Sequence, residues 1–144
     1  MIKRATVEDI RILAELAILL WPYNKVGELQ EEFKGDVYSN NNVIFLCFEE
    51  NIPVAFAQCS LRHDYVEGTE SSPVGYLEGI FVKPEYQGRG IARKLLVQCE
   101  EWTKSKGCSE LASDCELNNI GSLKFHLQVG FKEANRIICL TKQL

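Results

Sequence analysis

The stretch that decides the fold is Gly75-Tyr-Leu-Glu-Gly-Ile-Phe-Val82, followed closely by Gln87-Gly-Arg-Gly-Ile-Ala92. The first eight residues are rich in aromatic and β-branched types, which favours a strand. After the glycines, apolar residues recur every three or four positions, which predicts a helix with one buried face. These residues are Ile91, Leu95, Cys99 and Trp102. We therefore expect a strand, a glycine turn and a helix in succession.

The glycine turn contains Gly88 and Gly90, which permit backbone conformations that a side chain would forbid. Consecutive N–H groups at a helix N-terminus can then point into one concavity that binds phosphate oxygens. A tight turn without a ligand is the alternative, and the two glycines leave both open. The chain contains no Gly-x-x-x-x-Gly-Lys-Ser/Thr run, and Arg93 stands where a dinucleotide-binding fingerprint needs a small residue. Those two nucleotide motifs are excluded.

Composition bounds the class of protein. A chain of 144 residues with 46% hydrophobic content fits one domain, residues 1–144, with its own core. The net charge of −4 and the pI near 5.3 disfavour a nucleic-acid partner and allow a cationic small molecule. No apolar run reaches the roughly 18 residues of a membrane-spanning helix, so we expect no membrane insertion.

The six cysteines are scattered, without a Cys-x-x-Cys pair. The chain also opens without the apolar core of a signal peptide, so we expect a reduced, cytoplasmic location. The two histidines, His63 and His126, lie far from any cysteine pair with zinc-finger spacing. We therefore expect no metal site.

Periodicity and turn residues give the order of the remaining elements. Thr6-Val-Glu-Asp9 has the pattern of a helix cap, and Glu50-Asn51 joins two β-rich segments as a hairpin. We expect strands at about 2–5, 43–49, 52–61, 75–82 and 110–114, helices at about 6–20, 28–38, 91–106 and 119–128, and closing strands within 130–144. The order β-α-α-β-β-β-α-β-α-β-β predicts a mixed α/β (α+β) layered fold.

Glu78 is the unusual residue of the central strand. Alternation should place Tyr76, Glu78 and Ile80 on one face and Leu77, Gly79 and Phe81 on the other. A carboxylate within an apolar strand is costly unless it meets a partner or a wet cleft. Glu78 is therefore a candidate functional residue, although a glutamate in a strand can also simply face solvent.

Gln87-x-x-Gly90-x-Ala92, placed directly after a hydrophobic strand, resembles the acetyl-CoA pyrophosphate loop of the GNAT (Gcn5-related N-acetyltransferase) superfamily. The order of elements and Gly130-Phe131 extend this resemblance over nearly the whole chain. A narrower set of motifs is similar to the chromosomal-type bacterial aminoglycoside 6'-N-acetyltransferases. The motifs are Leu20-Trp-Pro22, Arg62-His-Asp-Tyr-Val66, Ser71-Ser-Pro73, Leu77-Glu-Gly-Ile-Phe-Val82, Lys106-Gly-Cys108 and Ala112-Ser-Asp114.

The resemblance implies a GNAT fold with a mixed, mostly antiparallel sheet flanked by helices, and a homodimer. It implies acetyl transfer from acetyl-CoA to the 6'-amino group of an aminoglycoside by direct attack in a ternary complex, which confers antibiotic resistance. The substrate pocket would contain Trp21, Tyr65, Glu78 and Asp114, with Asn135 where the family often has an acid. Acetyl-CoA would be held by Ile80, Phe81, Val82, Gln87, Gly88, Arg89, Gly90, Ile91, Ala92 and Asn119.

The transfer needs a neutral amine, so a carboxylate that holds the ammonium and accepts its proton would help, and Glu78 is the candidate general base. His126 stands where many GNAT enzymes place a tyrosine that protonates the CoA thiolate; it could equally be a helix-surface residue. Trp21 and Tyr65 could be core aromatics, and Asp114 a turn residue. Two rival functions stay open: acetylation of a polyamine, peptide or protein amine, and a non-catalytic acyl-CoA-binding module.

Overall fold

The computed structural model describes residues 1–144. The strands are β1 (Ile2–Arg4), β2 (Asn42–Glu49), β3 (Ile52–Arg62), β4 (Val74–Val82) and β5 (Leu111–Ser113). The helices are α1 (Ile10–Leu20), α2 (Val26–Tyr38), α3 (Ile91–Ser105) and α4 (Ile120–Gln128), with short 3₁₀ turns η1 (Val7–Asp9) and η2 (Pro84–Tyr86). The expected helices and the first five expected strands are thus confirmed, with bounds shifted by a few residues.

The five strands form one sheet in the order β1-β2-β3-β4-β5. The first four pair antiparallel and β5 pairs parallel to β4, so the expected mixed, mostly antiparallel sheet is confirmed. Glu50 and Asn51 have φ values of 49° and 66° at the β2–β3 hairpin. Positive φ at both central residues is the geometry of a tight hairpin turn.

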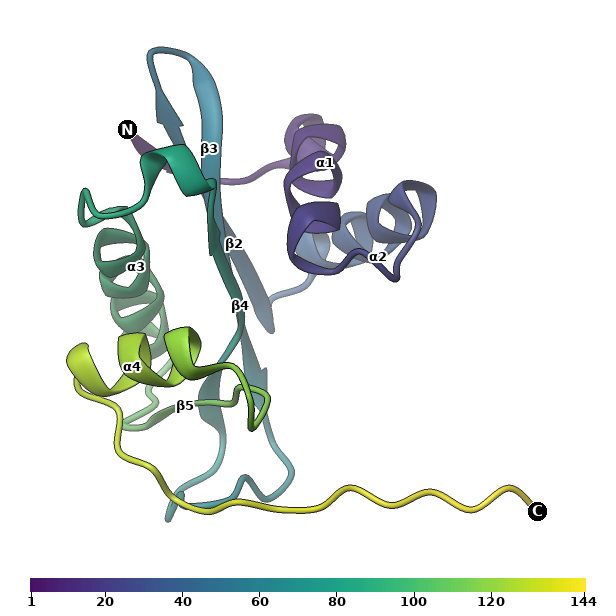
Figure 1. The fold of residues 1–144 in the computed structure, drawn as a ribbon, viewed down its shortest axis with the longest axis vertical. Coiled ribbons are helices and arrows are strands. Elements are labelled where there is room, and N and C mark those ends of the chain that lie inside the picture. Colours follow the sequence, from purple (N-terminus) through teal and green to yellow (C-terminus); the bar gives the residue numbers. More distant parts are fainter.

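Helices cover both faces of this sheet, α1 and α2 on one side and α3 with α4 on the other (Figure 1). Strand alternation supplies both cores: Ile44 and Leu46 of β2 face α1 and α2, and Val43 and Phe45 face α3. The expected cap of the first helical segment forms, since the Thr6 N–H donates to Asp9 Oδ2 at 2.8 Å. None of the helices has the length and apolar character needed to cross a membrane.

The expected strict alternation of β4 is wrong, because a β-bulge interrupts it at Glu78. Leu77 pairs with Cys59 and Gly79 pairs with the adjacent Gln58, so Glu78 is left without a partner on β3. An extra residue in one strand reverses the faces beyond it. Phe81 accordingly packs on the α1 and α2 side, and Ile80 packs on the α3 side.

The expected closing strands are also wrong for the single chain. Residues 131–144 form no regular structure and run out from the body (Figure 1). A strand needs a neighbour for its backbone hydrogen bonds, and this segment leaves the sheet after passing the loop that follows β3. Ala134 still touches that loop, since a Cβ at Gly68 would collide with it. We call residues 137–144 the C-terminal arm.

Candidate active site

A polar cleft of about 330 Å³ opens between the end of α1, α2 and the centre of the sheet. Its lining contains one hydrophobic residue, Trp21, and two acids. Trp21 stands at the end of α1 because Pro22 disfavours helical geometry in the residue before it. The lining residues are Trp21, Asn24, Glu32, Asn42, Gln58, Ser60 and Glu78.

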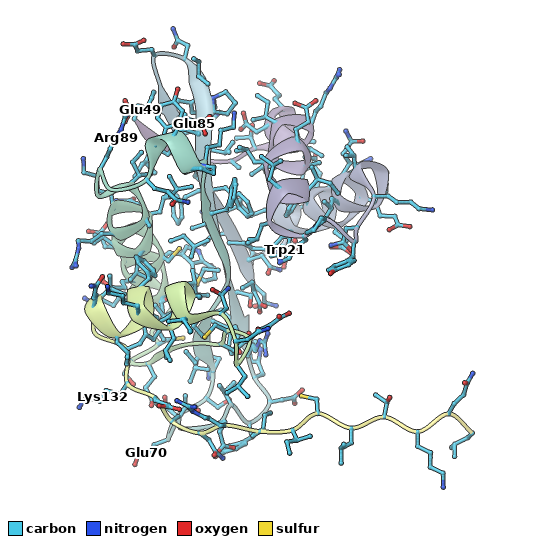
Figure 2. The ribbon with its side chains drawn as sticks, in the orientation of Figure 1. Trp21, Glu49, Glu70, Glu85, Arg89 and Lys132 are labelled. Carbon is cyan, nitrogen blue, oxygen red and sulfur yellow. The ribbon has the colours of Figure 1, made fainter.

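Trp21 lies against the bulged part of β4, and Figure 2 shows it at the lower end of α1 facing the sheet. Its ring meets Phe56 edge-on, with centroids 5.9 Å apart. A Cβ built on Gly79 would lie 2.6 Å from Trp21 Cζ2. The glycine therefore lets the indole ring pack directly on the strand, beside Glu78.

Glu78 is held by two residues of β3. Its Oε1 accepts from Ser60 Oγ at 2.6 Å and from Arg62 Nε at 3.0 Å, and its Oε2 accepts from Arg62 Nη2 at 2.9 Å. The Glu78 side chain retains 27% exposure and lines the cleft. The carboxylate is thus neither a plain solvent-facing group nor an unpaired buried charge.

Asp114 is linked to Glu78 through two further side chains. The Arg62 guanidinium lies over the Tyr76 ring, 3.4 Å from its centroid. The Tyr76 hydroxyl donates to Asp114 Oδ2. Burial and Asp114 together raise the pKa of Tyr76, so the hydroxyl keeps its proton and remains the donor. The two acids expected from the sequence are thus connected by two sets of hydrogen bonds and one cation–π contact.

A further carboxylate approaches the cleft from α2. Asp36 Oδ2 accepts from Gln58 Nε2 at 2.9 Å. Burial raises the pKa of Asp36, and the neighbouring charges of Glu32 and Glu78 raise it further. Three carboxylates that repel one another around one opening favour a cationic ligand.

The glycine loop has the backbone geometry that its residues indicate. Gly88 and Gly90 have φ values of 78° and 79°, and Gly90 caps the N-terminus of α3. Gln87 Nε2 donates to the Val82 carbonyl at 3.0 Å, which fixes the loop to the end of β4. Arg89 Nη2 donates to the Glu85 carbonyl at 3.2 Å. The N–H groups of residues 91 and 92 begin a fifteen-residue helix, α3, whose N-terminus favours anions.

The C-terminal half of β4 has an open edge. The β4–β5 pairing ends at Leu77 and Ser113, so residues 78–82 have β3 on one side only. The Lys83 N–H donates to the Val54 carbonyl, and antiparallel ladders alternate. The N–H groups of Ile80 and Val82 therefore point toward the open edge, while that of Phe81 points toward β3.

His126 belongs to α4, is 8% exposed and reaches Ser113 of β5. Nδ1 lies 2.7 Å from the Ser122 carbonyl, and Nε2 lies 2.8 Å from Ser113 Oγ. A carbonyl only accepts, so Nδ1 carries a proton and donates it to the Ser122 carbonyl. Ser113 Oγ also lies 3.3 Å from the Leu77 carbonyl, to which it can donate. Both nitrogens are engaged inside the protein, and protonation of the CoA thiolate by His126 stays a prediction. Asn119 caps α4, its Oδ1 accepting from the Ser122 N–H at 3.1 Å.

Tyr65 and Asn135 lie apart from the cleft lining. Tyr65 is 77% exposed on the loop after β3. That loop is fastened to the start of β5, because the carboxylate of Glu110 accepts from the N–H groups of Glu70 and Ser71. Asn135 Nδ2 donates to Glu67 Oε1 at 3.1 Å, so it contacts the same loop. Neither side chain lines the cleft or forms a hydrogen bond with Glu78.

Sequence reasoning missed several residues that line the cleft or contact its lining. Gln58, Ser60 and Arg62 are polar at alternate positions of an otherwise apolar β3, and this period of two was the available signal. Glu32 and Asp36 lie among the acids of an amphipathic helix, a pattern shared by ordinary solvated faces. No local feature of the sequence distinguishes Glu32 and Asp36 from such surface acids.

A second hollow, of about 360 Å³, lies near Glu49, Glu85 and Arg89 (Figure 2). It contains none of the expected substrate residues.

The chain belongs to the acetyltransferase (GNAT) family, whose family model matches residues 10–131. This confirms the superfamily assignment that the glycine loop and the order of elements indicate.

The chain is also similar to proteins named as aminoglycoside 6'-N-acetyltransferases, as its narrower set of motifs indicates. Aminoglycoside N(6')-acetyltransferase type 1 from Stenotrophomonas maltophilia is 41% identical over 138 residues, which are 95% of this chain and 89% of the relative. The protein of the same name from Acinetobacter haemolyticus is 34% identical over 99% of this chain and 98% of its own length. The structure of AAC(6')-Iy in complex with the bisubstrate analogue CoA-S-monomethyl-acetylneamine superimposes with a TM-score of 0.95 at 33% identity. That comparison covers all of this chain and 98% of the other.

Proposed function

We propose that this protein transfers the acetyl group of acetyl-CoA to the 6'-amino group of aminoglycosides and thereby confers resistance. The observation that carries the proposal is the placement of Glu78. It stands at a bulge of β4, inside an acidic cleft and directly before the open edge of the strand. Relatives named for this reaction, and a solved relative holding a CoA–aminoglycoside analogue, support it.

The reaction requires no covalent enzyme intermediate. The lone pair of the neutral 6'-nitrogen attacks the thioester carbonyl carbon, and the carbonyl π electrons move to oxygen. Collapse of this tetrahedral oxyanion breaks the carbon–sulfur bond and releases the CoA thiolate, which takes up a proton. The nitrogen loses its remaining excess proton to give the amide. Glu78 is the group placed to accept a proton from the amine, directly or through water.

Acetyl-CoA would bind across the open edge of β4 and the glycine loop. The N–H groups of Ile80 and Val82 would bind the donor and the developing oxyanion, an effect typically worth about 2.7–4 kcal/mol per donor. Gly88 to Ala92 would surround the pyrophosphate at the α3 N-terminus. Arg89 would add a cation there, and Phe81 and Asn119 would support the walls of the site.

The aminoglycoside would occupy the cleft. Trp21 offers a flat apolar surface for a sugar ring, and Glu32, Asp36 and Glu78 offer carboxylates for ammonium groups. Asp114 and Tyr65 would cover the substrate from the β5 side and the loop. Asn135 holds that loop through Glu67, which assigns it an indirect part in substrate binding.

The quaternary state belongs to the same proposal. We infer a homodimer in which the C-terminal arm contacts a second copy of the chain. Ile137, Ile138 and Leu140 of the arm are 71%, 86% and 86% exposed, and contiguous exposed apolar residues mark interaction surfaces. We also infer one acetyltransferase domain over residues 1–144 and a cytoplasmic location, in keeping with six free cysteines, four of them buried.

Release of CoA, measured with acetyl-CoA and kanamycin, spermine or a peptide mixture as acceptor, tests the function. The proposal predicts rapid turnover with kanamycin and little with the other acceptors. Preference for spermine or peptide would place the protein with another class of amine acetyltransferase. Tight acetyl-CoA binding without turnover on any acceptor would indicate a non-catalytic module.

A further inference from the structure

Arg62 holds the carboxylate of Glu78 from outside the cleft. The guanidinium binds both carboxylate oxygens, at 3.0 and 2.9 Å. Ser60 and Glu78 line the cleft, whereas Arg62 does not. Arg62 is 42% exposed and lies over the Tyr76 ring. The charged pair thus joins the end of β3 to the bulge of β4 and is not formed by two free surface side chains.

This arrangement leaves limited acceptor capacity for a substrate. A carboxylate offers about four lone-pair positions, and Ser60 with the two Arg62 donors occupies three of them. An amine in the cleft would use the remaining one. It would then share a single carboxylate with a permanent cation.

Such sharing has an electrostatic consequence for the amine. A nearby positive charge disfavours the ammonium form, and a carboxylate already neutralised by a guanidinium attracts an ammonium less strongly. Both effects make the bound amine lose its proton more readily. Acetyl transfer needs that neutral amine.

We propose that Arg62 is a positioning residue that fixes Glu78 and keeps the reacting amine of the substrate deprotonated. The inference rests on the proposed role of Glu78. Arg62, the last residue of β3, would thus influence whether the substrate amine is protonated, although it need not touch the substrate.

Other charged and titratable groups face the pair and act on the same amine. From α2 the carboxylates of Glu32 and Asp36 favour the ammonium form, and Asp114 does the same from the end of β5 through Tyr76. Cys59 lies on the opposite face of the sheet near Glu78. Because the acids oppose Arg62, the deciding measurement compares variants at Arg62 while these groups stay in place.

The experiment measures kcat and KM for kanamycin from acid to alkaline pH, at saturating acetyl-CoA, for wild type, Arg62→Met, Arg62→Lys and Glu78→Gln. The acid limb of kcat reports groups in the enzyme–substrate complex. Arg62→Met should lower KM, because the unpaired Glu78 binds ammonium more tightly. It should also lower kcat near neutral pH and move the acid limb up by about one pH unit or more. At alkaline pH its kcat should approach that of wild type.

Arg62→Lys keeps the charge without the two-pronged contact, so its acid limb should stay near that of wild type while kcat falls moderately. Arg11→Met is the matched control, since Arg11 pairs with Glu15 on the exposed surface of α1 and should leave kcat, KM and the pH profile unchanged. A raised KM with an equal loss of kcat at every pH in Arg62→Met would overturn the inference, as would an unshifted acid limb. Full turnover in Glu78→Gln would instead overturn the proposed role of Glu78, and with it the basis for Arg62.

Discussion

Glu78 shows how one residue acquires a function from its backbone. As the unpaired residue of a bulge it lies where β4 changes faces, so its carboxylate lines the cleft beside Ser60 and also reaches Arg62 outside it. The apolar residues around Glu78 in the strand predict that its carboxylate needs a partner. Only the register of β3 and β4 reveals which partners it has, because a bulge leaves no distinct trace in a short apolar sequence.

Glu78→Gln keeps the volume and one acceptor but removes charge and basicity. We expect kcat for kanamycin to fall by about 10²–10⁴-fold, the usual contribution of a general base. Asp114→Asn should instead raise KM with a smaller change in kcat, because Asp114 reaches Glu78 only through Tyr76 and Arg62. Steady-state kinetics on both variants check this. The reverse pattern would exchange the two roles.

Asp36→Asn should stabilise the fold while weakening substrate binding. Burial raises the pKa of Asp36 in the folded state, so the stability contributed by its neutral form is fully present below the unfolded pKa and is lost as pH rises through the folded pKa. The melting temperature of the variant should therefore equal that of wild type at acid pH and exceed it at neutral pH. Its KM for kanamycin should rise up to about fivefold, the worth of a partly exposed ion pair. A lower melting temperature than wild type at neutral pH would contradict this reading.

At the scale of elements, the strand, glycine loop and helix could be predicted closely because their signals are local. Periodicity placed α3 within a residue of its observed bounds, and positive φ at Gly88 and Gly90 follows from their lack of side chains. The bulge, the Arg62–Glu78 pair and the α2 acids could not be predicted, since they depend on pairing and packing between distant segments. The motif containing Arg62 was visible, but its contact with Glu78 was not.

Gly90→Val tests the assignment of the glycine loop. A β-branched residue is strained at a φ of 79°, although a Cβ there would meet no atom within 4 Å. The loop should therefore change its backbone without collapse of the core, and the KM for acetyl-CoA should rise by about tenfold or more, while the KM for kanamycin changes little. Unchanged acetyl-CoA affinity in a folded variant would refute the pyrophosphate assignment. Gly27→Ala on α2, also free of contacts, is the control.

At the scale of the molecule, two helical layers enclose one sheet, and the C-terminal arm is the part left over. Its apolar residues predict strands, but a strand requires an adjacent edge, and the single chain brings none to it. The sequence pattern was therefore informative about the need for a partner and not about where the partner comes from. A second copy of the chain would supply an edge for the predicted strands and would cover the exposed apolar residues of the arm.

Removal of residues 137–144 should convert the dimer to a monomer in light scattering after size exclusion, because the arm carries the exposed apolar side chains. Ile138→Glu should weaken the dimer in the same direction without shortening the chain. Lys142→Glu, which changes charge on the arm but not its apolar residues, serves as the comparison. A monomeric wild type, or a dimer that survives the truncation, would contradict the assembly.

The position of the acetyl group in the product is the most direct test of the proposed function. Wild-type protein is incubated with acetyl-CoA and kanamycin, and the product is examined by two-dimensional NMR with mass spectrometry. We expect a single added acetyl group on the 6'-nitrogen, with one CoA released for each product formed. Acetyl on a different nitrogen, or no acetylated aminoglycoside, would contradict it.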